Sequence, residues 1–285
     1  MKPFQIGDAE IGGPQLFVLA GPCVVESADL CLSVAGRLKA ACAVRGLPFV
    51  FKASYRKANR SSARSFEGLG MDEALAALAR VKREIGVPVI TDVHETGEVR
   101  AAAEVADALQ IPAFLCRQSA LLAAAAATGC AVNVKKGQFL SPHGMANVVE
   151  KLTLSGCERM MLTERGTTFG YGDLVVDMRS LVILSENGWP VVFDATHSLQ
   201  SPGGAVTDGL REFAFPLMRA AVACGVDGLF FETHPDPDRA MSDAATQLPL
   251  DLAEAFLDDA RRVREAVAGR DGPVPHAAGA KRRHG

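Results

Sequence analysis

The sequence lacks several features that would assign it to a membrane, secreted or nucleic-acid-binding class. No apolar run is long enough to span a bilayer, and the first residues contain no apolar region typical of a signal peptide. The formal net charge is -3, so the chain has no overall positive charge for binding nucleic acid. The seven cysteines are odd in number and have no paired spacing, which is typical of a reducing compartment. We therefore expect a cytoplasmic protein with no membrane partner and no nucleic-acid partner.

A glycine-rich dinucleotide-binding loop is also missing, which weakens the alternative of an open, doubly wound sheet. The chain does contain eight apolar segments of strand length, each followed by a segment of helical character. The strands are expected over residues 16–20, 49–52, 87–94, 108–114, 131–135, 159–163, 190–196 and 226–232. The helices are expected over residues 26–45, 72–85, 96–108, 119–127, 143–155, 177–187, 210–223 and 250–268. This order predicts an α/β protein with a (β/α)8 TIM barrel.

The two ends of the chain fall outside the repeating pattern. Residues 4–11 alternate weakly and predict a short N-terminal β-hairpin that caps one end of the barrel. Residues 1–268 are expected to form a single catalytic barrel. Residues 269–285 are polar, glycine-rich and basic near their end, and we expect a disordered tail.

In such a barrel, functional side chains collect at the carboxyl ends of the strands. The alternation of side chains along a strand directs Lys135 toward the barrel axis and Lys136 outward. The residues that end or follow the eight strands are therefore expected on one rim. They are Cys23, Lys52, Asp92, Arg117, Lys135, Arg165, His197 and Glu232.

Cations are concentrated just after the second strand, where Lys57 and Arg60 follow Lys52 among small polar side chains. Taken alone, such a cluster is more often a solvated basic loop. Here three further strand ends carry Arg117, Lys135 and Arg165, in a chain of negative net charge. This convergence predicts one or two small substrates that carry several anionic groups.

A second group of rim residues has the chemistry of metal ligands. Thiolate, imidazole and carboxylate together suit a divalent transition metal better than magnesium or calcium. The candidates are Cys23, His197, Glu232 and Asp243. Their spacing is not that of a zinc finger, and His94 and His234 also follow strands, so spacing alone leaves the choice of histidine open.

Longer motifs resemble the 3-deoxy-D-manno-octulosonate 8-phosphate synthases, over nearly the whole chain to about residue 265. The matching stretches include Ala20-Gly21-Pro22-Cys23, Lys57-Ala58-Asn59-Arg60-Ser61-Ser62, Asn133-Val134-Lys135-Lys136-Gly137 and Phe193-Asp194-Ala195-Thr196-His197-Ser198. The resemblance implies condensation of phosphoenolpyruvate with D-arabinose 5-phosphate, with release of phosphate, for lipopolysaccharide biosynthesis.

The resemblance also implies roles for individual residues. Lys52 and Lys57 would hold the two substrates, Lys135 and Arg165 would bind the phosphate of phosphoenolpyruvate, and Asp92 would contact the sugar. Asn59, Arg60 and Ser61 would meet the pentose phosphate, with Arg60 and Ser61 reaching in from a neighbouring subunit of a homotetramer. We expect Lys52, Lys57, Lys135 and Asp243 to be the catalytic residues.

Metal dependence is implied in the same way. The family divides into metal-dependent members with cysteine after Gly-Pro and metal-independent members with asparagine there. Cys23 therefore places this chain with the first group. The implied ligands are Cys23, His197, Glu232 and Asp243, which would hold iron, zinc, manganese or cobalt.

Two departures and three alternatives remain at this stage. Gly172 stands where the family pattern leads us to expect asparagine, and Ala120 ends an altered Gln-Thr-Asp run. The alternatives are a heptulosonate 7-phosphate synthase acting on erythrose 4-phosphate, a barrel that binds anions without catalysis, and an enzyme that forms a Schiff base on Lys52.

Overall fold

The fold is a closed barrel of eight parallel strands, seen in a computed structural model that describes residues 3–58, 68–168, 170–201 and 208–268. The ring closes because the last barrel strand, β12, pairs in parallel with both β3 and β9. In order around the barrel the strands are β3 (Phe17–Gly21), β4 (Phe49–Lys52), β5 (Val89–Asp92), β6 (Ala108–Ile111), β7 (Ala131–Lys135), β8 (Met160–Glu164), β9 (Val191–Asp194) and β12 (Gly228–His234). The predicted (β/α)8 architecture is confirmed.

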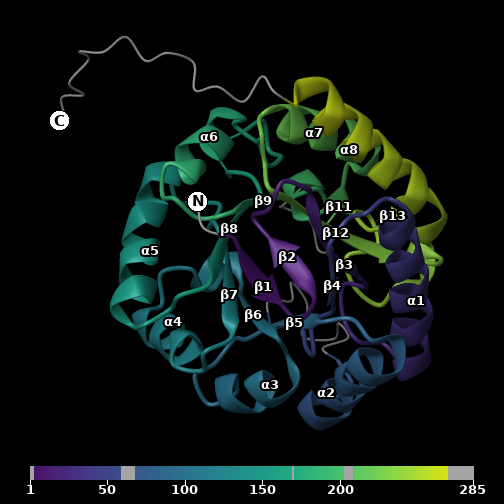
Figure 1. The fold of residues 1–285 in the computed structure, drawn as a ribbon, viewed down its shortest axis with the longest axis vertical. Helices are drawn as coiled ribbons and strands as arrows, with labels where there is room; N and C mark the ends of the chain where they lie inside the picture. Colours follow the sequence, from purple (N-terminus) through teal and green to yellow (C-terminus); the bar gives the residue numbers. More distant parts are fainter. Residues whose placement is uncertain (1–2, 59–67, 169, 202–207, 269–285) are drawn as a thin grey trace.

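A ring of helices surrounds the strands (Figure 1). Within the described part of the chain the α-helices are α1 (Ala28–Val44), α2 (Met71–Arg80), α3 (Val99–Val105), α4 (Ser119–Ala126), α5 (Met145–Leu154), α6 (Arg179–Ser185), α7 (Ala214–Ala223) and α8 (Ala253–Val267). Most begin later than predicted. Three are preceded by a 3-10 turn (Pro142–Gly144, Arg211–Phe213 and Leu250–Leu252), a common form of the first turn of a helix. The predicted end of α2 is a π-helix, Val81–Ile85.

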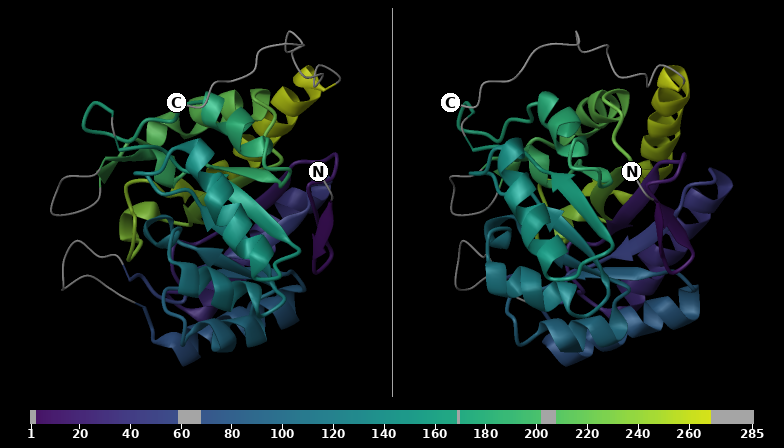
Figure 2. Two further views of the ribbon diagram at one scale, coloured as in Figure 1. Left: turned by 90° about the vertical axis from the view of Figure 1, so that its left-hand side faces the viewer. Right: turned by 60° about the vertical axis from the view of Figure 1, so that its left-hand side comes forward.

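The N-terminal hairpin closes the amino end of the barrel. It consists of antiparallel β1 (Phe4–Ile6) and β2 (Ala9–Ile11), and it crosses the centre of the ring in Figure 1. The side views in Figure 2 show it at one end of the molecule. Its buried side chains pack in one apolar cluster with inward-facing strand residues such as Leu19, Val50 and Ile90. Burying each large apolar side chain contributes about 1.5–3 kcal/mol to the stability of the folded state, so the hairpin stabilises the barrel while it covers its amino end.

The other half of the barrel interior is polar. Where apolar side chains fill the bottom, the next inward positions carry Asp92, Gln110, Asn133 and Thr163, all buried. They form a chain of hydrogen bonds: Thr163 donates to Asn133 (2.7 Å), Asn133 to Gln110 (2.8 Å) and Gln110 to Asp92 (2.5 Å). Such a satisfied network holds its members in fixed orientations. It therefore gives the candidate site a rigid floor.

Two pairings beyond the barrel were not predicted. The short strand β13 (Leu248–Pro249) pairs with the end of β12, and β10 (Gln200–Ser201) forms a hairpin with β11 (Asp208–Gly209). The first pairing brings the segment before β13, which includes Asp243, to the carboxyl rim. No helix in the described ranges is long and apolar enough to cross a membrane.

Candidate active site

Cys23, Glu232 and Asp243 meet at the carboxyl rim of the barrel. One ligand atom from each lies within 4.8 Å of the others, and the Cys23 Sγ atom is 3.0 Å from Asp243 Oδ2. Cys23 follows β3, where Gly21 is required because a Cβ atom there would collide with the carbonyl oxygen of Lys52 on β4. Asp243 has a φ of 47°, a left-handed backbone conformation that is uncommon for a non-glycine residue.

Glu232 has an unsatisfied oxygen. Its carboxylate is fully buried, Oε1 accepts a hydrogen bond from Lys52 Nζ at 2.6 Å, and Oε2 has no hydrogen-bond partner among the described residues. A buried carboxylate oxygen without a partner is costly. A cation bound between this oxygen, the Cys23 thiol and Asp243 would remove that cost, and this donor set suits zinc, iron, manganese or cobalt. The residues present thus fit a divalent transition metal.

His197 lies beside the same cluster. Its Nε2 atom is 3.6 Å from Glu232 Oε1, and its Nδ1 atom is 2.9 Å from Asp194 Oδ2. The other two candidate histidines lie elsewhere: His94 Nδ1 is 3.4 Å from the hydroxyl of Tyr55, and His234 Nε2 is 3.6 Å from Glu26. The structure therefore places His197, rather than His94 or His234, beside Glu232, while the compact group of ligand atoms consists of Cys23, Glu232 and Asp243.

Three lysines lie against this cluster, of which Lys52 and Lys135 are buried and Lys57 is partly buried. Lys52 pairs with Glu232, and Lys57 Nζ is 3.3 Å from Asp243 Oδ2 and 3.8 Å from Glu232 Oε1. Lys135 Nζ is 2.7 Å from Asp194 Oδ2 and 3.7 Å from the centre of the Phe230 ring. Each ammonium group is therefore held at a fixed position by an acidic partner, and all three positive charges lie on the carboxyl rim near the cluster.

The charges of these groups follow from their neighbours. Burial raises the pKa of Glu232, but the ammonium groups of Lys52 and Lys57 outweigh that effect and hold it well below its usual range. In the same way Lys52 and Lys135 outweigh burial and lower the pKa of Asp92. Burial, then Asp243 and Glu232, raise the pKa of the Cys23 thiol. A divalent cation at the cluster would favour the thiolate instead.

Arg165, directly after β8, adds a third buried cation to Lys52 and Lys135. Its Nη2 atom donates to Gln200 Oε1 at 2.6 Å, whereas Nη1 is buried and makes no hydrogen bond with any residue that the structure describes. Burial lowers the pKa of its guanidinium. A buried guanidinium nitrogen with a free donor is suited to a phosphate or carboxylate group.

Comparison with known proteins assigns the family. The model of the DAHP synthetase I family matches residues 4–268. The chain belongs to the DAHP synthetase I family. Three proteins named 2-dehydro-3-deoxyphosphooctonate aldolase are similar to this family member: that of Koribacter versatilis (53% identical, covering 94% of this chain and 98% of the relative), that of Syntrophobacter fumaroxidans (50%; 98% and 99%) and that of Cupriavidus necator (55%; 85% and 86%). The resemblance seen in the motifs is confirmed.

Not every predicted site residue of this DAHP synthetase I family member lies in the cluster. Asn59, Arg60 and Ser61 lie outside the described residues, as does the predicted disordered tail, 269–285. Arg117 is exposed, and its side chain makes no hydrogen bond or ion pair with another described residue. Its role in substrate binding stays a prediction.

The departure at position 172 has a local explanation. Gly172 has a φ of 93°, and glycine and asparagine are the residues that most readily adopt positive φ values. The backbone there accommodates the glycine that replaces the expected asparagine. Ala120 is exposed in the first turn of α4, away from the buried cluster.

Sequence reasoning missed Asp194, the partner of both Lys135 and His197. It lies in a motif that was noticed only for its histidine. The signal was available, because strand alternation places Asp194 on the same inward face as Val192. Lys136 points out of the barrel as predicted, but it is fully buried and 3.4 Å from Glu164.

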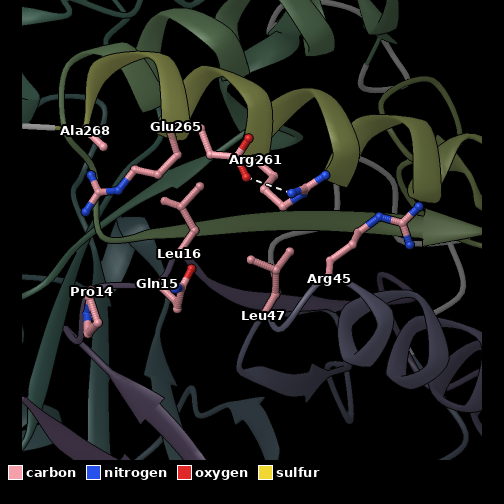
Figure 3. A pocket seen from close by; sticks show the side chains of 9 residues that line it. Pro14, Gln15, Leu16, Arg45, Leu47, Arg261, Glu265 and Ala268 are labelled. Carbon is pink, nitrogen blue, oxygen red and sulfur yellow. Dashed lines mark hydrogen bonds and ion pairs between the residues drawn. The ribbon is translucent and has the colours of Figure 1, made fainter.

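A separate surface pocket lies at the opposite, amino end of this DAHP synthetase I family barrel (Figure 3). It is lined by residues that precede β3 and β4, among them Leu16 and Leu47, and by the last turns of α8. Two of its arginines already have acidic partners: Arg45 is 2.8 Å from Asp258, and Arg261 is 2.7 Å from Glu265. The pocket therefore offers anions less free positive charge than the carboxyl rim does.

Proposed function

We propose that the protein condenses phosphoenolpyruvate with D-arabinose 5-phosphate and water to give 3-deoxy-D-manno-octulosonate 8-phosphate and phosphate, as a step of lipopolysaccharide biosynthesis in the cytoplasm. The observation that carries the proposal is the placement of four cations, three of them buried, beside a thiol, an imidazole and two carboxylates on the carboxyl rim. The names of relatives at 50–55% identity support it.

The reaction forms one carbon–carbon bond and one carbon–oxygen bond, the latter to water, and breaks the carbon–oxygen bond to phosphate; the aldehyde oxygen gains a proton and the water loses one. The methylene carbon of phosphoenolpyruvate attacks the aldehyde, water adds at the carbon that carries the phosphate, and the resulting hemiketal phosphate expels phosphate. Lys135 and Arg165 hold the phosphate of phosphoenolpyruvate. Lys52 and Lys57 hold the two substrates in reacting geometry, and Asp92 contacts the sugar.

Asp243 completes the catalytic set. Burial raises its pKa, but Lys57 outweighs that effect and lowers it, so its carboxylate is ionised near neutral pH and can accept a proton from the attacking water. Cys23, His197, Glu232 and Asp243 are the proposed ligands of iron, zinc, manganese or cobalt. When bound there, such a cation would supply Lewis acidity for the aldehyde.

The Schiff-base alternative conflicts with the surroundings of Lys52. Burial lowers the pKa of this ammonium, but Glu232 and Asp92 outweigh burial and raise it. A lysine nucleophile needs the neutral amine, and this one is held charged. Borohydride should therefore trap no substrate adduct on Lys52, and a trapped adduct would overturn this mechanism.

The deciding assay measures phosphate release from phosphoenolpyruvate with each sugar phosphate in turn. We expect release with arabinose 5-phosphate and little with erythrose 4-phosphate. The opposite preference would favour the heptulosonate synthase alternative. Release with neither sugar, despite binding of phosphoenolpyruvate, would favour the anion-binding barrel.

The proposed assembly is a homotetramer in which Arg60 and Ser61 act in a neighbouring site. Mixing an Arg60→Ala variant with a Lys135→Met variant tests this arrangement, because mixed tetramers then contain some sites with neither change. Recovery of activity on mixing supports shared sites. No recovery in tetramers shown to be mixed by mass spectrometry would contradict them.

A further inference from the structure

A single carboxylate connects the two halves of the proposed site. Asp194 ends β9 and is fully buried. Its Oδ2 atom lies 2.7 Å from Lys135 Nζ and 2.9 Å from His197 Nδ1. Its Oδ1 atom accepts hydrogen bonds from the backbone N–H groups of Thr196 (3.0 Å) and His197 (2.8 Å). Asp194 thus contacts the phosphate-binding lysine, the metal-binding histidine and the turn that carries this histidine.

The contact with Asp194 decides which ring nitrogen of His197 carries the proton. An ionised carboxylate can only accept hydrogen bonds. The Asp194 carboxylate accepts hydrogen bonds from the Lys135 ammonium and from two backbone N–H groups, an arrangement that suits the ionised form. Lys135 Nζ is 3.2 Å from His197 Nδ1 and could donate to it if Nδ1 carried no hydrogen. In that tautomer, however, the lone pair on Nδ1 would face the negative Asp194 carboxylate at 2.9 Å, which is unfavourable. The favourable assignment puts the hydrogen on Nδ1 and leaves the lone pair on Nε2, which is the nitrogen nearest Glu232.

The same oxygen fixes the position of Lys135. The ammonium lies between Asp194 Oδ2 and the face of the Phe230 ring, so it has one strong hydrogen bond and one cation–π contact within the barrel. A carboxylate whose only task was to cap the turn at Thr196–His197 would need only Oδ1. The use of Oδ2 by two proposed functional groups calls for a different explanation.

We propose that Asp194 is a positioning residue that sets the His197 tautomer for metal binding and at the same time holds Lys135 for the phosphate of phosphoenolpyruvate. The inference rests on the proposed function for the identity of that ligand. It predicts that a change at Asp194 weakens binding of the metal and of phosphoenolpyruvate together, through its contacts with His197 and Lys135.

The test is Asp194→Asn, with Asp227→Asn as the matched control. Both exchange a buried aspartate for its neutral isostere, but Asp227 lies at the amino end of β12 and accepts a hydrogen bond from the backbone of Val191. For Asp194→Asn we expect Co²⁺, followed by its thiolate absorption band, to bind about 10- to 100-fold more weakly. We expect phosphoenolpyruvate, followed by calorimetry without sugar, to bind roughly 3- to 10-fold more weakly. The control should change neither affinity by more than about twofold.

A double-mutant comparison separates positioning from a merely structural role. In a Lys135→Met background, Asp194→Asn should no longer weaken phosphoenolpyruvate binding but should still weaken Co²⁺ binding. Equal additional losses of both affinities in this background would indicate general distortion and would overturn the inference. So would metal and phosphoenolpyruvate affinities for Asp194→Asn within twofold of those of the unmodified protein.

A measurement on the unmodified protein covers the case in which Asp194→Asn does not fold. Protein labelled with ¹⁵N-histidine and loaded with ¹¹³Cd²⁺ should show cadmium coupling to Nε2 of His197 and a proton on Nδ1. Coupling to Nδ1 would overturn the inference. Because these are binding measurements, they remain decisive even if the protein turns out not to condense the two proposed substrates.

Discussion

Lys52 and Glu232 form a buried ion pair, with 2.6 Å between the ammonium nitrogen and the nearer carboxylate oxygen. The two side chains are 1% and 0% exposed. They come from β4 and β12, the two strands that flank β3, and Lys52 also donates to the carbonyl oxygen of Cys23 at 3.1 Å. The pair therefore ties together three neighbouring strand ends, and each charge depends on the other because both are removed from water.

Lys52→Met should destabilise the protein by about 3–5 kcal/mol near neutral pH, because it leaves Glu232 buried without its closest positive partner. The lowered pKa of Glu232 means that its ionisation stabilises the folded state above the unfolded pKa of about 4.3, and that this stabilisation is lost as the pH falls through the folded value. The difference in the free energy of unfolding between the variant and the unmodified protein should therefore become smaller at acidic pH. Urea unfolding at pH 7 and at lower pH measures it.

The control for Lys52→Met is the double variant Lys52→Met/Glu232→Gln, which removes both charges of the pair. It should recover part of the lost stability at pH 7. A single variant as stable as the unmodified protein would show that Lys57, 3.8 Å from the same carboxylate oxygen, is a sufficient partner for Glu232.

Cys23→Ala should remove bound metal and most of the activity, because the thiol is a central member of the proposed ligand set. Metal content by elemental analysis and phosphate release measure the two effects. Cys31→Ala is the matched control, since Cys31 is a buried cysteine in the core that packs α1 against the barrel. Full activity of the unmodified protein in excess chelator would contradict metal dependence, and Cys23→Asn tests whether metal-free turnover remains.

The barrel could be predicted because its pattern is local. Each strand is a short apolar segment, each helix follows within one turn or loop, and strand alternation correctly separated Lys135 from Lys136. The helix starts could not be placed so well. The 3-10 turns before α7 and α8 consist of residues that are equally at home in a helix, and only the backbone geometry distinguishes them.

The site was predictable to the extent that its residues end strands. Cys23 and Glu232 follow from barrel register once the strands are assigned, whereas register alone does not choose His197 over His94 and His234. The position of Asp243 does not follow from register, since it reaches the rim through a loop held by the two-residue strand β13; it was a candidate for its carboxylate chemistry alone. Asp194 could have been found from alternation, but a buried acid is recognised as functional only when its partners are known.

Arg165→Lys should weaken phosphoenolpyruvate binding by roughly 10- to 100-fold, because a single ammonium cannot both keep the hydrogen bond to Gln200 and offer the free donor of Nη1. We expect the change mainly in KM. Arg179→Lys is the control, because Arg179 is exposed and pairs with Asp177. An unchanged KM for Arg165→Lys would show that the free guanidinium nitrogen is not used, and Arg117→Ala would then test the remaining predicted cation.

Asp227→Asn should change the pH dependence of stability without changing the site. Burial raises the pKa of Asp227, so the folded state holds its proton more tightly than the unfolded state does. Stability contributed by this group is therefore complete below the unfolded pKa of about 3.9 and is lost as the pH rises through the folded value.

Asparagine does not titrate in this range, and its carbonyl oxygen can still accept the hydrogen bond that Val191 N donates at 2.8 Å. In urea unfolding at pH 7, the free energy of unfolding of Asp227→Asn should equal or exceed that of the unmodified protein. As the pH falls below 5, the free energy of unfolding of the unmodified protein should rise relative to that of the variant. A variant less stable at pH 7 with the same difference at pH 4 would mean that Asp227 stabilises the barrel through its hydrogen bond alone.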